Sequence, residues 1–301
     1  MYKLKRLTVF TPTYNRAYIL PQLYQSLCEQ TNKDFVWLII DDGSTDTTKE
    51  IVSNWIEESI IDIEYIYQNN SGKMAAYNKA LTKTETPLFL CIDSDDYLVS
   101  NGVEKILKAA IGIETASELS GIVAYRGKED KSLLGNEFPQ DLEYSPLKDL
   151  YKKGFEGDTT LIFKTDIAKK YLFPLLPGEK FISEMYVYNQ IDEKYNLKIL
   201  REVLTVCNYL EDGYTKNGYS LVKNNPMGWA LIYCQKKDYA KGFKERFRCA
   251  AFSGSYVMMA SKAAKETAYK QGLYKIGILE FISWPMSLLL YLRRKWVHRY
   301  E

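Results

Sequence analysis

The first hundred residues alternate between short apolar runs and helical patterns, and this alternation limits the possible folds more than any other feature. The runs of strand length are Leu7–Thr11, Phe35–Asp41, Ile61–Tyr67 and Pro87–Asp93. The helical patterns between them are Tyr18–Glu29, Thr47–Glu58 and Lys73–Lys83. This order is typical of a parallel sheet with right-handed crossover connections. We therefore expect an α/β fold that binds its ligands beyond the carboxyl ends of the strands.

Three polar motifs follow strands of this predicted sheet. They are TPTYNR at Thr11–Arg16, DDGS at Asp41–Ser44 and DSDD at Asp93–Asp96. The last motif comes directly after a buried-looking run and places three carboxylates close together. Such carboxylates repel one another unless a cation lies between them, and oxygen ligands favour Mg²⁺ or Mn²⁺, which commonly holds a substrate diphosphate. The alternative for an isolated DSDD is a solvated acidic turn that caps the next helix.

Composition excludes several classes of protein. With 301 residues, 46% of them hydrophobic and 14% aromatic, the chain can bury a sizeable core, which argues against disorder. The five cysteines contain no CxxC pair, as expected for reduced structural thiols, and a single histidine, His298, argues against a zinc site. The N-terminus lacks an apolar segment of signal-peptide length, so we expect the protein to stay inside the cell.

The net charge of +2 hides an asymmetry along the chain. Residues 216–301 hold 16 Lys and Arg against 5 Asp and Glu, whereas residues 1–215 hold 24 against 33. An acidic body with a basic C-terminal region suggests contact with an anionic surface. We expect a membrane surface rather than nucleic acid, because no nucleic-acid recognition motif accompanies the basic region and the body is acidic.

The last apolar segment, Ile276–Leu292, is at the short limit for spanning a bilayer and contains Glu280. Glu280, Ser283 and Ser287 fall on one helical stripe, which leaves a broad apolar face. Basic and aromatic residues follow at Arg293–Trp296. We expect a helix lying in the membrane interface; the alternative is an ordinary helix packed on the domain.

The rest of the chain is mixed. We expect a helix at Val103–Leu119, strands at Gly121–Tyr125, Thr159–Lys164 and Lys198–Asn208, a loop or lid at Tyr214–Gly228, and helical structure over Trp229–Tyr269.

Taken together, TPTYNR, DDGSTD, QNNSGKMAAYN and DSDD resemble, in this order and spacing, the family 2 glycosyltransferases of the GT-A fold, over roughly residues 6–210. The resemblance implies a GT-A catalytic domain at 1–215, with a Rossmann-like, nucleotide-sugar-binding half (1–100) and an acceptor half (101–215). Residues 216–301 would then form a basic helical C-terminal extension. Family members transfer a sugar from a nucleotide donor, usually UDP-linked, with inversion at the anomeric carbon.

The resemblance also implies roles for individual residues. Asp42 is expected to accept the imide N–H of uracil, whereas Asp41 is the better candidate for a structural carboxylate. Asp95 is the first choice as a direct ligand of Mn²⁺ or Mg²⁺, Asp93 is expected to hold the ribose or the metal, and Asp96 is an alternative ligand. The other expected donor-site residues are Thr11, Pro12, Tyr14, Arg16, Asn69, Gly72, Lys73 and Ser94. A bound metal would neutralise the charge that builds on the leaving UDP.

Inverting transfer needs a base for the acceptor hydroxyl. Family members carry an acidic pair at the start of a helix, and the matching position here is Glu184, followed by Met185 where the second acid is expected. Glu184 is therefore the preferred base, with Glu179 in reserve. The alternative for Glu184 is an acid in the first turn of a helix, where the helix dipole stabilises its negative charge. Lys216 lies in a stretch that looks familiar from enzymes of bacterial surface polysaccharides.

The sequence thus predicts a metal-dependent inverting glycosyltransferase that adds one sugar from a UDP-sugar to a glycan acceptor, lipid-linked and destined for the cell surface. One sugar per encounter is expected because the QxxRW motif of processive members is absent. The predicted location is the inner face of the cell membrane. The alternatives are a catalytically silent binding partner at the membrane and a sugar nucleotidyltransferase; the latter lacks its glycine-rich loop, since TPTYNR contains no glycine.

Overall fold

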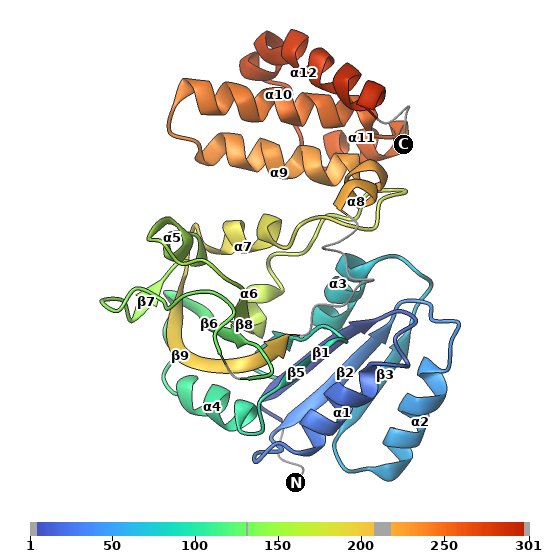
Figure 1. Cartoon of the computed structure of the whole chain (residues 1–301), viewed down its shortest axis with the longest axis vertical. Helices are drawn as coiled ribbons and strands as arrows, with labels where there is room; N and C mark the ends of the chain where they lie inside the picture. The colour runs from blue at the N-terminus through green and yellow to red at the C-terminus, as the bar shows by residue number, and fades with distance from the viewer. Residues whose placement is uncertain (1–4, 131, 208–217, 298–301) are drawn as a thin grey trace. The chain divides into compact units, whose positions relative to one another are not determined.

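A computed structural model describes residues 5–130, 132–207 and 218–297 of the chain (Figure 1). Contacts within the chain divide it into two compact units. The first unit comprises Met1–Leu172 and Val187–Leu210, and the second comprises Phe173–Tyr186 and Glu211–Glu301.

The first unit contains the predicted strand–helix alternation. Strands β1 (Leu7–Thr13), β2 (Phe35–Asp41), β3 (Ile63–Tyr67) and β4 (Leu88–Cys91) are parallel, in the order β3-β2-β1-β4. The helices that connect them are α1 (Leu20–Cys28), α2 (Thr48–Glu58) and α3 (Lys73–Lys83). The carboxyl ends of these strands therefore meet at one edge, as the sequence predicted.

The sheet continues beyond β4 with mixed pairing. Within the described residues it adds β8 (Thr159–Lys164), β6 (Leu119–Gly127), β9 (Asn196–Cys207) and β5 (Asp96–Leu98), while β7 (Tyr144–Ser145) pairs with β9. The helices of this part are α4 (Gly102–Ala109), α5 (Leu147–Lys152), α6 (Thr165–Ala168) and α7 (Met185–Ile191). The helix predicted to reach Leu119 is too long, because α4 stops before Gly112, whose φ of 82° is left-handed.

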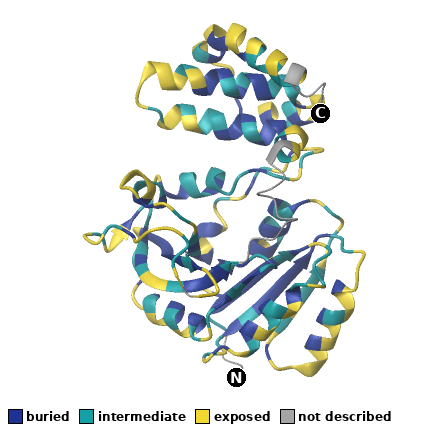
Figure 2. Ribbon diagram, viewed as in Figure 1, coloured by how far each residue is buried: buried dark blue, intermediate teal, exposed yellow. Residues whose placement is uncertain are grey.

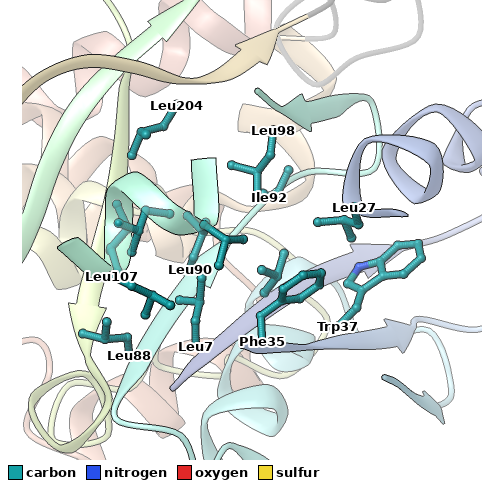
Figure 3. Close-up of a cluster of buried hydrophobic side chains, with 14 of the residues drawn as sticks. Leu7, Leu27, Phe35, Trp37, Leu88, Leu90, Ile92, Leu98, Leu107 and Leu204 are labelled. Atoms are coloured by element: carbon teal, nitrogen blue, oxygen red, sulfur yellow. The ribbon is translucent and has the colours of Figure 1, made fainter. Parts of the chain in front are cut away.

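Both faces of the parallel strands are covered. Leu7, Phe35 and Trp37 belong to a cluster of buried side chains that continues into α1 and α4 (Figure 3). Because successive side chains of a strand alternate in direction, Phe10 lies on the opposite face, where its ring is 5.8 Å from that of Tyr77 in α3. Burial on two sides explains why these strands read as nearly continuous apolar runs.

The C-terminal part of the second unit, from residue 218 to residue 297, is mostly helical, whereas residues 173–184 form no helix or strand. It contains α8 (Gly218–Asn224), α9 (Pro226–Tyr239), α10 (Phe243–Met259), α11 (Lys262–Lys270) and α12 (Ile278–Val297). The loop predicted at Tyr214–Gly228 is wrong for its described part, because α8 and the start of α9 occupy it; residues 214–217 lie outside the description. Pro226 occupies the first turn of α9, where proline is tolerated.

The helical region predicted at Trp229–Tyr269 is confirmed, but as three helices. The break before α11 falls at Ser261, whose hydroxyl accepts a hydrogen bond from the amide of Ala264. None of the helices in the described part of the chain is long and apolar enough to cross a membrane.

Leu90 in β4 and Ile111 after α4 offer a matched test of this core. Leu90 is fully buried, so Leu90→Ala should lower the free energy of unfolding by about 2–5 kcal/mol through lost contacts and a cavity. Ile111 is 71% exposed, so Ile111→Ala should change that energy by less than about 0.5 kcal/mol. Urea denaturation followed by circular dichroism measures both, and equal effects would contradict the assigned core.

Candidate functional site

The loops that follow β1 and β2 are joined by hydrogen bonds at the carboxyl edge of the sheet. The amide of Asn15 donates to Ser44 Oγ at 2.9 Å, and Asn15 Oδ1 accepts from the amide of Thr45 at 2.7 Å. The amide of Ala17 donates to Asp46 Oδ2 at 3.0 Å. Asn15 adopts a φ of 52°, which asparagine tolerates better than most residues. The TPTYNR and DDGS segments are thus held next to each other at this edge of the sheet.

The turn after β2 depends on Asp41 and Gly43. Asp41 is buried and accepts from the Ser44 amide at 2.7 Å and from the Tyr65 hydroxyl at 2.6 Å, which is the structural use considered for it. Gly43 has a φ of 90°, and a Cβ at this position would lie 2.9 Å from the amide nitrogen of Asn70. Only glycine permits both this backbone conformation and this close approach.

Asp42 organises the loop between β3 and α3. Its Oδ1 accepts from Gln68 Nε2 and from the Ser71 amide, both at 2.7 Å, and its Oδ2 accepts from the Gly72 amide at 2.8 Å. A carboxylate oxygen can accept two hydrogen bonds, so Oδ2 retains capacity for a ligand N–H. Asn69 lies in the same loop with an exposed side chain.

The residues predicted to lie under the nucleoside are Thr11, Pro12, Tyr14 and Arg16. Thr11 is fully buried, and its hydroxyl accepts from Trp37 Nε1 at 3.0 Å, so this side chain serves the core. Tyr14 is 48% exposed, whereas Pro12 is half-buried. Arg16 is half-buried and donates to the Tyr18 hydroxyl. Tyr14 and Arg16 therefore remain the candidates for ligand contact by their side chains.

Lys73 and Asp93 form an ion pair that sequence reasoning did not foresee. Lys73 is the first residue of α3, and its Nζ lies 2.7 Å from Asp93 Oδ1 and 2.9 Å from Oδ2. Burial disfavours the charged form of Asp93, but the cations of Lys73 and Arg126 outweigh it and hold the pKa of this carboxyl below its usual range. Because Gly72 precedes Lys73, a short chain of contacts links Asp42 to Asp93.

Arg126 is a site residue that the sequence analysis missed. Its Nη1 lies 3.2 Å from Asp96 Oδ2 and 3.6 Å from Cys207 Sγ, and its Nε donates to the Thr159 carbonyl at 3.0 Å. Burial raises the pKa of Asp96 to about 7; neighbouring carboxylates add to this shift and Arg126 opposes it. Arg126 comes from β6 and Cys207 from β9, and no local motif marks either residue.

The donor set at DSDD fits a hard cation. Burial, together with the charge of Asp93, raises the pKa of Asp95, a half-buried carboxyl; Ser94 is buried. No group of three His, Cys, Asp or Glu side chains in the described ranges could hold a metal ion. Mg²⁺ is usually held by one or two carboxylates plus substrate phosphates, so a site with fewer than three protein carboxylates is compatible with this ion. Two of the three carboxylates already lie next to a cation, Asp93 next to Lys73 and Asp96 next to Arg126.

Glu179 and Glu184 have different surroundings in the second unit. Glu179 Oε1 accepts from the Met227 amide at 2.7 Å and Oε2 from the Gly228 amide at 2.8 Å, so both oxygens hold the first turn of α9. Burial raises the pKa of Glu179, and these two hydrogen bonds oppose the shift. Glu184 is half-buried directly before α7. Lys216 lies outside the described residues.

The role of Glu179 can be tested by substitution. Glu179→Gln leaves one acceptor oxygen for two amides, so we expect it to lower the free energy of unfolding by about 1–2 kcal/mol. Glu266→Gln, at an exposed carboxylate in α11, is the matched control and should change it little. Urea denaturation measures both variants. An unaltered stability for Glu179→Gln would show that these hydrogen bonds do not hold α9.

Comparison with known proteins shows the family of this chain. Residues 8–172 match the family described as Glycosyl transferase family 2. The GalNAc(5)-diNAcBac-PP-undecaprenol beta-1,3-glucosyltransferase of Campylobacter jejuni is 27% identical over 289 residues, covering 90% of this chain and 86% of that protein. The teichoic acid poly(glycerol phosphate) polymerase of Staphylococcus epidermidis is 34% identical over 101 residues, which are 33% of this chain and 14% of the polymerase.

Two solved structures share the fold. TarS 1–349 of S. aureus in complex with UDP-GlcNAc has a TM-score of 0.61 at 18% identity, covering 96% of this chain and 81% of that one. Mannosyltransferase PcManGT from Pyrobaculum calidifontis, in complex with GDP-Man and Mn²⁺, has a TM-score of 0.54 at 16% identity, covering 98% and 88%. The expected GT-A fold with C-terminal helices is confirmed. The chain belongs to glycosyltransferase family 2 and is an enzyme of that family.

Proposed function

We propose that this enzyme transfers one sugar from a UDP-sugar to a lipid-linked glycan, with inversion and with the help of Mn²⁺ or Mg²⁺. The observation that carries the proposal is the contact chain at the carboxyl edge of the sheet. Asp42 accepts from the Gly72 amide, and Lys73, the next residue, pairs with Asp93. A base-binding carboxylate, a cation and a metal-binding carboxylate are thereby held in one connected site.

The donor site is proposed to read the uracil through Asp42. Its Oδ2 accepts one protein hydrogen bond and has room for the imide N–H, while its burial strengthens that bond. The exposed ring of Tyr14 supplies a stacking face, and Arg16 adds positive charge nearby. TarS, a structure of the same fold, was solved with UDP-GlcNAc, which supports UDP as the carrier.

The metal site is proposed at Asp95 and Asp93. A bound Mn²⁺ or Mg²⁺ would neutralise charge on the leaving diphosphate. The structure of PcManGT with Mn²⁺ supports this choice of ion. Lys73 supplies a second positive charge next to Asp93, and a lysine ammonium group is a common phosphate ligand. The amide of Asp96 donates to the carbonyl of Asp93 at 3.1 Å and closes the turn that carries Asp95. Ser94, in the same turn, is buried.

Asp95→Asn tests the donor and metal sites together. Wild type should bind UDP in a Mn²⁺-dependent manner, and the variant should bind at least about tenfold more weakly in Mn²⁺, because one charged ligand is lost. The control is Asp62→Asn, at a carboxylate whose side chain is 64% exposed. Isothermal titration calorimetry measures all three proteins. Metal-dependent binding retained in Asp95→Asn would contradict the proposed ligand.

Glu184 is proposed as the general base for the acceptor hydroxyl. Its competitor Glu179 has both oxygens engaged by backbone amides, and residues 1–215 contain no histidine that could act as the base. A half-buried carboxylate at the start of a helix can take the proton while remaining accessible to an acceptor. Methionine at position 185 leaves Glu184 without the acidic neighbour seen in the family resemblance.

Glu184→Gln keeps the size of the side chain but removes its basicity. We expect the rate of sugar transfer to fall by about 100-fold or more, with UDP affinity unchanged, since the base acts on the acceptor rather than on the nucleotide. Glu193→Gln changes an exposed acid and should leave the rate unchanged. Single-turnover transfer assays and calorimetry separate the two effects. Full activity in Glu184→Gln would assign the base elsewhere.

Two further observations support the proposed acceptor and location. The Campylobacter relative, which aligns with 90% of this chain, is named for an acceptor carried on PP-undecaprenol. The excess of basic residues at positions 216–301 favours an anionic membrane surface, where such a carrier is anchored. We therefore place the enzyme peripherally on the inner face of the cell membrane, in the synthesis of cell-surface polysaccharide.

A further inference from the structure

The polarity of α12 is reversed relative to an ordinary surface helix. Glu280, Ser283 and Ser287, the stripe identified in the sequence, are 7%, 0% and 1% exposed. Ile278 and Phe281 on the other side are 79% and 78% exposed, and Figure 2 shows exposed residues along much of this helix. A helix on a water-exposed bundle normally buries its apolar stripe. α12 packs on the bundle, which was the alternative considered for this segment, and it also presents apolar side chains outward.

Specific polar contacts hold α12 in this orientation. Glu280 forms an ion pair with Lys237 of α9, and their side chains are 5% and 12% exposed. Arg294 donates to Ser255 Oγ of α10 at 2.7 Å, and its guanidinium lies 3.8 Å from the ring centroid of Tyr256. If α12 rotated so that its apolar face pointed into the bundle, Glu280 and Arg294 would lose these contacts. Breaking a buried ion pair strongly destabilises a folded protein. The apolar face is therefore fixed outward.

The outward face is large and is flanked by cations. Lys275 precedes it, and Arg293 and Lys295 follow it, all three exposed. Its large apolar members, each between 44% and 79% exposed, are Ile278, Phe281, Ile282, Trp284, Met286, Leu289 and Leu292. A contiguous exposed surface of this kind marks an interaction site.

Charge indicates what covers this face. The region 216–301 holds 16 basic and 5 acidic residues, so pairing α12 with a second copy would bring two basic regions together. An anionic bilayer accommodates the apolar side chains below its headgroups and attracts the flanking cations. We propose that the outward face of α12, between Lys275 and Lys295, docks on an anionic phospholipid surface. The proposal rests on the proposed membrane location and names the surface that achieves it.

The test uses the full chain and vesicles, without donor or acceptor. Wild type should float with vesicles of phosphatidylglycerol and phosphatidylcholine in equal parts, and bind pure phosphatidylcholine more weakly. The double substitution Ile278→Ser with Phe281→Ser should weaken binding by at least about tenfold, because two large side chains no longer enter the bilayer. Point variants are preferable to deleting α12, which would strip α10 of its packing partner.

Ile111→Ser is the matched control, because it removes an exposed isoleucine from the first unit, where it is 71% exposed. It should bind vesicles like wild type, and all variants should keep the wild-type circular dichroism spectrum. Failure of wild type to bind the anionic vesicles, or equal binding by the double variant, would overturn the proposal. A wild-type dimer that Ile278→Ser with Phe281→Ser converts to a monomer would instead assign the face to a second copy. Binding of UDP, measured separately, reports on the catalytic proposal alone.

Discussion

The carboxylate of Asp42 is the constraint on which the rest of the site depends. By accepting hydrogen bonds from the Ser71 and Gly72 amides, it fixes the loop that begins α3. That loop sets the position of Lys73, whose ammonium then lies on Asp93 at the end of β4. Leaving a buried carboxylate without these hydrogen bonds would cost free energy, so the loop is held close to Asp42. The same carboxylate that orders this edge of the sheet is proposed to bind the uracil base.

Local sequence patterns predicted the local structure well. The bounds of β2 and α3 match their apolar and helical patterns, since each is set by its own residues and by burial on the sheet. Contacts between distant segments were not predictable. Arg126 reaches Asp96 from thirty residues away, on a strand whose pairing no motif records. The pairing of Asp96 in β5 with Cys207 is equally non-local, so the sequence did not predict that a strand begins at Asp96.

The last helix shows a second limit of reading a single sequence. The pattern of Glu280, Ser283 and Ser287 predicted two faces of different polarity, but periodicity does not say which face meets the protein. The contacts of α12 with the other helices determine this. Glu280 forms an ion pair with Lys237. Ser287 packs against Gly254, where the Cβ of any other residue would lie 2.5 Å from the Oγ of Ser287. The sequence also could not distinguish the roles of Glu179 and Glu184. The amides that donate to Glu179 lie 48 and 49 residues further along the chain, and no local pattern predicts such contacts.

We propose that the carboxyl edge of the first unit binds a nucleotide diphosphate through Asp42 and a metal through Asp95. A crystal structure of the protein with UDP and Mn²⁺ is the decisive experiment. We expect uracil to lie against Asp42, with the anomalous signal of manganese next to Asp95 and the diphosphate. UDP bound at another part of the chain, or manganese bound away from Asp93 and Asp95, would contradict it.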